Sequence, residues 1–81
     1  MKVFFTPHFQ RSYNKLSAKI KKAFDKQFGF LLGDIRHPSL RIKKYDESRG
    51  LFQGRATDSH RFYFEIKKDI YIFHEIRTHD K

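Results

Sequence analysis

Hydrophobic residues change their spacing once along the chain, from a helical period to a strand period. A short apolar run at 2–5 predicts a strand, and Thr6-Pro7 after it is typical of a helix start. A Thr N-cap suits this place, and Pro fits the first helical position, where no N–H is needed. The apolar positions that follow recur on one helical face: Phe9, Tyr13 and Leu16.

A second helix is predicted directly after the first. Ser17 can cap it, and Gly33 is a plausible end. Its apolar positions keep the helical period: Ile20, Phe24, Phe28 and Leu31. Most of its lysines fall on other faces, which indicates a solvated side. The two helices, joined at Leu16-Ser17, form a predicted hairpin with one apolar side.

Beyond Gly33 the pattern favours strands. The segment 34–39 contains His37-Pro38 and predicts a loop, because the residue before Pro disfavours helix. Residues 46–50 predict a turn. Strands are expected over 41–45, 51–57, 60–67 and 69–77, where alternating β-branched and aromatic residues dominate.

Alternation assigns the two faces of the predicted sheet. The positions expected to meet the helices are Phe52, Gly54, Ala56, Phe62, Phe64, Ile66, Ile70, Ile72 and Ile76. The opposite positions are Gln53, Arg55, Arg61, Tyr63, Glu65, Tyr71, Phe73, Glu75 and Arg77. His74 shares the core-face parity and is expected to be hydrogen-bonded and half-buried.

Register follows from keeping these faces separate. A three-residue loop at 57–59 places Phe52 opposite Phe64 and Arg55 opposite Arg61. The same reasoning makes 67–69 the next loop, which places Tyr63 opposite Phe73 and Arg61 opposite Glu75. The predicted fold class is α+β, with an N-terminal strand and helical hairpin packed on a mostly antiparallel sheet and its other face partly open.

Composition narrows the functional classes. The 81 residues fit one domain over 1–81, and 18 basic against 9 acidic residues give a net charge of +9, which favours a polyanionic partner. The absence of Cys excludes disulfides, thiolate catalysis and Cys-containing zinc sites. The N-terminal apolar run is too short for a signal peptide, and no stretch suffices to span a bilayer. A soluble, cytoplasmic protein is expected, with no membrane and no metal.

The open face carries the candidate chemistry. Two arginines side by side on adjacent strands, Arg55 and Arg61, repel each other unless an anion such as a phosphate bridges them. A histidine beyond the last strand, His79, has a pKa suited to proton transfer. The other basic members are Lys43, Lys44 and Arg77. The alternative is a solvated strand face in which Arg61 pairs with Glu75.

A metal site built from histidines has weaker support than the basic open face. His74 with His79, or His8 with His37, shows neither a two-His helical spacing nor a carboxylate at a motif-defining offset. The lysine-rich second helix is better explained as a solvated face than as a membrane or nucleic-acid surface.

Several segments together resemble the RelE/ParE superfamily of toxins from bacterial and archaeal toxin–antitoxin modules. They are His37-Pro38-Ser39-Leu40, Lys43-Lys44, Phe52-Gln53-Gly54-Arg55, His60-Arg61-Phe62-Tyr63-Phe64-Glu65-Ile66 and His79-Asp80. The preceding strand and helical hairpin match the order of that fold. Two features differ: many members have a basic residue where this chain has Gln53, and many have a catalytic tyrosine in a C-terminal tail, whereas this sequence ends at Lys81.

The resemblance implies a small toxin silenced by a cognate acidic antitoxin. In the RelE branch such a toxin enters the ribosomal A site and cuts mRNA without cofactor or metal, because the mRNA's own 2′-hydroxyl attacks the adjacent phosphate. By position, Arg55 and Arg61 would clamp that phosphate, Lys43, Lys44 and Arg77 would bind the RNA, and His79 would be the general acid or base. The alternatives are a ParE-like DNA gyrase poison and a catalytically inactive member that binds RNA or antitoxin.

Overall fold

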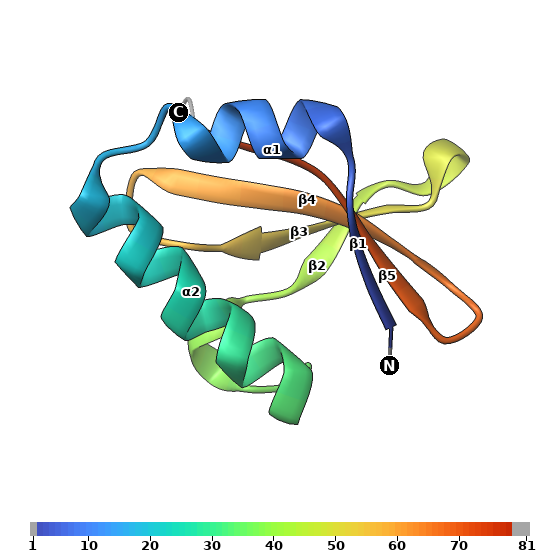
Figure 1. Ribbon diagram of the computed structural model, residues 1–81. Coiled ribbons are helices and arrows are strands. Elements are labelled where there is room, and N and C mark those ends of the chain that lie inside the picture. The colour runs from blue at the N-terminus through green and yellow to red at the C-terminus, as the bar shows by residue number, and fades with distance from the viewer. Residues whose placement is uncertain (1, 79–81) are drawn as a thin grey trace.

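The computed structural model describes residues 2–78 and has the predicted α+β architecture. Strand β1 (Lys2–Phe5) leads into helices α1 (Pro7–Asn14) and α2 (Ala18–Gly33). Two short 3-10 helices, η1 (Pro38–Leu40) and η2 (Glu47–Arg49), flank strand β2 (Lys43–Asp46). Strands β3 (Leu51–Arg55), β4 (His60–Lys67) and β5 (Ile70–Thr78) complete the fold (Figure 1).

The strands form one five-stranded sheet in the order β1-β5-β4-β3-β2, with β1 parallel to β5 and the other pairs antiparallel. Helix α2 crosses one face, and α1 lies along the sheet beside β5 (Figure 1). Strand β1 pairs only with residues 70–73 of β5. Beyond residue 73, helix α1 lies along this edge of β5 in place of a strand. There the Ile76 N–H donates to Ser12 Oγ at 3.4 Å. Within residues 2–78 no α-helix covers the opposite face.

Both helix starts are capped as the sequence predicts. The Phe9 N–H donates to Thr6 Oγ1 at 3.1 Å, and the Ile20 N–H donates to Ser17 Oγ at 3.3 Å. Each bond satisfies one of the N–H groups that a first turn leaves unpaired. Helix α2 ends at Gly33, also as predicted.

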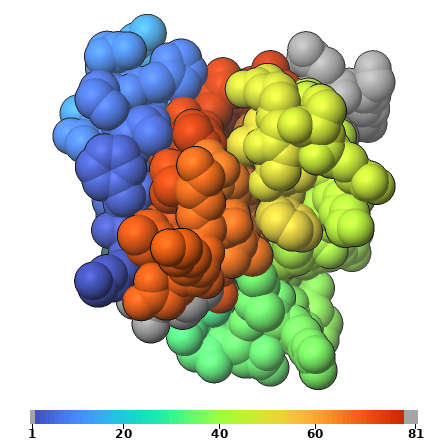
Figure 2. Space-filling model, turned by 90° about the vertical axis from the view of Figure 1, so that its right-hand side faces the viewer, coloured from blue at the N-terminus to red at the C-terminus, as the bar shows by residue number. Residues whose placement is uncertain are grey.

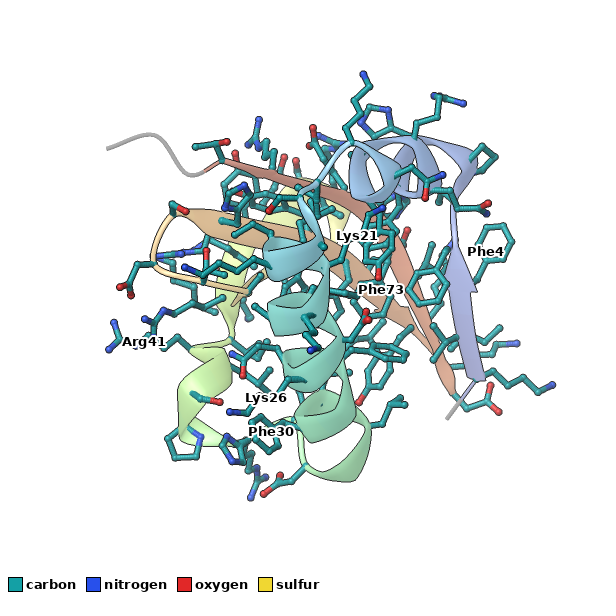
Figure 3. The ribbon with its side chains drawn as sticks, turned by 60° about the vertical axis from the view of Figure 1, so that its left-hand side comes forward. Phe4, Lys21, Lys26, Phe30, Arg41 and Phe73 are labelled. Atoms are coloured by element: carbon teal, nitrogen blue, oxygen red, sulfur yellow. The ribbon has the colours of Figure 1, made fainter. Side chains whose placement is uncertain are left out.

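The core between α2 and the sheet is made of aromatic rings. Phe62, Phe64 and Phe73 are 0% exposed. Phe24 of α2 reaches them, with its ring centroid 5.4 Å from that of Phe62 and 6.0 Å from that of Phe73. Figure 3 shows Phe73 pointing into this interior, whereas Phe4 points away from it. The helices are therefore held mainly by a cluster of phenylalanines.

The predicted register of the first hairpin is confirmed. Phe52 pairs with Phe64 and Arg55 with Arg61. The N–H groups of Ala56 and Thr57 both donate to the carbonyl oxygen of His60, at 3.1 and 3.2 Å, and close the loop.

The predicted register of the second hairpin is wrong. Its turn has two residues rather than three, because Lys67 pairs with Ile70 and Lys68 adopts a positive φ of 53°. This shift by one residue turns Tyr71 and Phe73 toward the helices, and Ile70 and Ile72 to the other face.

A β-bulge then restores the expected parity. The register shifts between Tyr63 and Phe64, so that Tyr63 pairs with Glu75 instead of Phe73. Arg61 consequently pairs with Arg77 instead of Glu75. Ile76 is buried on the helix side as expected, but Ile66 is 36% exposed. The two-residue turn thus places the large Phe73 ring in the core, and the bulge after it returns Glu75 and Ile76 to their expected faces.

Candidate functional site

A groove lies between α1 and the open face of the sheet. It has a volume of about 660 Å³. Figure 2 shows this side of the molecule, with the blue segment around α1 and the yellow-green segment around η2 on either side of the orange and red strands β4 and β5. The residues that line the groove are Thr6, Pro7, His8, Arg11, Tyr45, Arg49, Leu51, Tyr63, His74, Glu75 and Arg77. We call it the α1–sheet groove.

Arg55 and Arg61 lie beside one another at one end of the open face, where the first hairpin closes. Arg55 Nη2 pairs with the carboxylate of Asp58. Arg61 Nη1 donates to the carbonyl oxygens of Thr57, at 2.6 Å, and of His60, at 3.1 Å. These loop oxygens offset the repulsion between the two guanidiniums. Asp58 is 94% exposed, so its contact with Arg55 is open to competition by another anion.

Arg77 stands next to this pair and is fixed by two tyrosines. Its guanidinium carbon lies 4.8 Å from the centroid of the Tyr63 ring, and its Nη2 donates to the Tyr45 hydroxyl at 3.0 Å. Polar contact with the Tyr63 side chain and the charge of Glu75 raise the pKa of Arg77, against an opposite effect of burial. Arg77 is therefore cationic at any pH at which the protein functions.

Two histidines of the groove contact carboxylates. His74 Nε2 lies 2.8 Å from Glu65 Oε1, and the His74 side chain is 35% exposed. His74 is half-buried and hydrogen-bonded as predicted, but its assignment to the core face is wrong, because it is the extra residue of the bulge and contacts Glu65 on the open face. His8 Nε2 of α1 lies 3.5 Å from Glu75 Oε2.

The two neighbouring lysines fall on different faces. Lys43 pairs with Gln53 on the open face, whereas Lys44 pairs with Phe52, whose ring is on the helix side. Both are exposed. Only Lys43 can therefore reach the open face from within the regular strand.

A turn capped by Asp46 places Arg49 beside the groove. Asp46 Oδ1 accepts from the Ser48 hydroxyl at 2.7 Å and from the backbone N–H of Arg49 at 3.3 Å. The hydrogen bond from Ser48 is the main cause that lowers the pKa of Asp46, and the backbone bonds add to it. The ionised carboxylate thus fixes the short helix η2 beside the groove.

Sequence patterns missed several groove residues. His8, Arg11 and Arg49 come from α1 and η2, which the hydrophobic pattern does not place near the open face, and Tyr45 comes from β2. One signal was available: His8 and Arg11 are three residues apart, and therefore share a face of α1. His79, the predicted acid or base, lies outside the described residues.

The part of the chain that the structure describes offers neither a metal-binding cluster nor a membrane-spanning helix. Residues 2–78 contain no group of three or more His, Asp or Glu side chains close enough together to hold a metal ion. Neither α1 nor α2 is long and apolar enough to cross a membrane.

The fold is that of RelE/ParE superfamily toxins. A YoeB/ParE toxin from Agrobacterium tumefaciens superposes with a TM-score of 0.81 at 15% identity, covering 99% of this chain and 100% of that chain. The RelB–RelE antitoxin–toxin complex from Methanococcus jannaschii matches with a TM-score of 0.76 at 17% identity, covering 93% of this chain and 88% of that chain. YafQ from Escherichia coli matches with a TM-score of 0.72 at 12% identity, covering 95% of this chain and 91% of that chain. No protein-family model and no curated protein sequence matches the chain. The structural likeness confirms the predicted fold.

Proposed function

We propose that this chain is the toxin of a type II toxin–antitoxin module and acts in the cytoplasm as a ribosome-dependent mRNA endonuclease that inhibits translation. One observation carries the proposal: an open, basic and aromatic sheet face in a fold shared with YoeB, RelE and YafQ toxins. Its cognate partner would be an acidic antitoxin, as RelB is the partner of RelE in the solved complex.

The proposed reaction needs no metal or cofactor. The 2′-oxygen of one nucleotide forms a bond to the adjacent phosphorus while the bond from phosphorus to the 5′-oxygen breaks. A base accepts the 2′-hydroxyl proton and an acid protonates the leaving 5′-oxygen. The products are a 2′,3′-cyclic phosphate and a 5′-hydroxyl.

Arg55 and Arg61 are the proposed phosphate clamp. Their side-by-side position at the hairpin suits two guanidiniums that stabilise the growing charge on the phosphate oxygens. Lys43 and Arg77 would bind the RNA, Lys44 would add only a general positive charge from the other face, and His79 would transfer the proton. These groups are too few to align a flexible RNA alone, so the ribosome would supply the alignment.

Induced expression tests the proposal. Protein synthesis should stop, and primer extension should find mRNA cut within translated frames. The matched control is Arg61→Ala, produced at the same level, which should leave the mRNA intact. Translation that continues while DNA supercoiling fails would favour a gyrase poison instead.

A further inference from the structure

We propose that the α1–sheet groove binds one unpaired guanine base of the RNA strand, stacked on Tyr45 and hydrogen-bonded to Glu75. This inference rests on the proposed function for the identity of its ligand. It assigns a role to a part of the open face that the phosphate clamp does not use.

Tyr45 has the properties of a stacking platform. One side of its ring lies against Tyr63, with centroids 4.6 Å apart, and Arg77 holds its hydroxyl. Tyr63 is itself 4% exposed and therefore rigid, whereas Tyr45 is 48% exposed. Exposed aromatic rings on a sheet face stack unpaired bases in many RNA-binding proteins.

Glu75 supplies the hydrogen-bonding specificity. Its two oxygens lie 3.5 Å from His8 Nε2 and 3.8 Å from Arg77 Nε, which is too long for good hydrogen bonds, so the carboxylate has unused acceptor capacity toward the groove. An ionised carboxylate only accepts. Guanine is the RNA base with two adjacent donors, N1–H and N2–H, on one edge, and it matches the two oxygens.

Positive charge beside the platform suits the flanking backbone. Arg11 and Arg49 line the groove, and both are exposed. Arg11 also borders a neighbouring hollow of about 350 Å³, which is lined as well by Lys15, directly after the end of α1. An RNA strand that leaves the groove would therefore bring its phosphates close to several cationic side chains in turn.

The groove is also placed correctly relative to the clamp. The pair Tyr63–Glu75 lies two residues along the strands from the pair Arg61–Arg77. Two residues span about 7 Å of strand, within the reach of one nucleotide. A guanine in the groove would thus belong to a nucleotide next to the bound phosphate.

The test measures binding of trinucleotides that cannot be cleaved, because every 2′-hydroxyl is methylated. The probes are AGA and the same molecule with inosine, which lacks N2–H, in place of guanine. With the full-length protein, fluorescence anisotropy should give about tenfold weaker binding for inosine. Backbone amide resonances of Tyr45, Tyr63 and Glu75 should shift on adding AGA.

Variants separate stacking from hydrogen bonding. Tyr45→Ala should weaken AGA binding about tenfold, while Tyr45→Phe keeps the ring and should bind within a factor of about two. Glu75→Gln should remove the preference for guanine over inosine. The control Lys22→Ala removes an exposed charge on α2 and should bind like the parent, apart from a small general electrostatic loss.

Equal affinity for AGA and the inosine probe, or unchanged binding by Tyr45→Ala, would overturn the inference. Amide shifts in the groove with an acidic peptide but none with either trinucleotide would also overturn it, in favour of a protein ligand. The proposed function is tested separately by ribosome-dependent cleavage. Cleavage without guanine binding rejects this inference alone, and guanine binding without cleavage rejects the nuclease proposal alone.

Discussion

Arg61 and Lys44 differ in how rigidly each is held. Arg61 lies on a central strand and donates to two loop carbonyls, whereas Lys44 is exposed on an edge strand and faces away from the groove. A planar guanidinium in fixed position can contact two phosphate oxygens, and a neighbouring lysine cannot replace that geometry.

Arg61→Ala should therefore lower mRNA cleavage about 10²-fold or more, and Lys44→Ala less than about tenfold. The measurement is the rate of mRNA cleavage in a purified translation system. Thermal unfolding of both variants is the control, because Arg61 also holds the hairpin loop. Equal losses in the two variants, at equal folded fractions, would remove Arg61 from the proposed clamp.

Phe64 tests the aromatic core. It is 0% exposed, and its ring centroid lies 5.4 Å from that of Phe73 and 5.8 Å from that of Phe62. Phe64→Ala should lower the free energy of unfolding by about 3 to 5 kcal/mol, because it leaves a cavity among rings that cannot collapse into it. Urea denaturation measures this change. Phe4→Ala is the matched control, since Phe4 is 54% exposed, and it should cost much less.

Gly54 shows how a single residue allows this core to form. A Cβ at position 54 would overlap the ring of Phe62 and lie 2.9 Å from Cδ1 of Ile42. The glycine on β3 thus leaves space for the Phe62 ring beside the neighbouring strand. Sequence alternation placed Gly54 on the helix side but gave no indication of this close contact.

At the scale of elements, the β4–β5 hairpin decides which side chains reach the groove. Its two-residue turn shifts the pairing by one residue, and the bulge adds a second shift that restores the expected parity. Phe73 is buried between these two changes, and the bulge residue His74 and the following Glu75 both line the groove. A regular strand would turn one of these two side chains to the opposite face.

The turn itself can be tested at Lys68, whose φ of 53° is unfavourable for a residue with a Cβ. Lys68→Gly should raise the free energy of unfolding by about 0.5 to 1 kcal/mol, measured by urea denaturation. Lys67→Gly is the control: it lies in a strand and should destabilise. Destabilisation of similar size by both variants would contradict the turn described here.

These elements also show what the sequence allows one to predict. Strong alternation and helix caps were enough for the element order, both helix starts and the first hairpin, because each depends on neighbouring residues. The second hairpin was mispredicted because the turn and the bulge each move the pairing by one residue in the same direction. Their combined shift of two residues leaves Ile76 on the predicted face although its partner is Phe62 rather than His60, whereas the face predicted for Ile72 was wrong.

The candidate site was only partly predictable for a related reason. Arg55, Arg61 and Arg77 follow from strand parity, and the structure brings them together on the open face. Arg11 and Arg49 depend on how α1 and η2 pack around that face, which no local pattern encodes. The groove is thus a tertiary feature, whereas the arginine pair is a feature of one hairpin.

At the scale of the whole molecule, net charge governs association. A charge of +9 on 81 residues should accelerate binding of an acidic antitoxin and make the rate salt-dependent. Raising the salt from 0.05 to 0.5 M should slow association with the proposed antitoxin by about tenfold or more, with a smaller change in the dissociation rate. Stopped-flow fluorescence measures both rates. A salt-independent association rate would contradict an electrostatic partner surface.

On the proposed function, the open sheet face cuts ribosome-bound mRNA by using the 2′-hydroxyl of that mRNA. The most direct measurement incubates the purified protein with end-labelled mRNA, free or in the A site of programmed ribosomes, with and without a single 2′-deoxy nucleotide at the mapped cleavage position. We expect cleavage only on the ribosome, a 2′,3′-cyclic phosphate at the new end, and no cleavage at the deoxy position. Ribosome-bound mRNA that stays intact with active protein, or is cut equally at the deoxy position, would contradict the account.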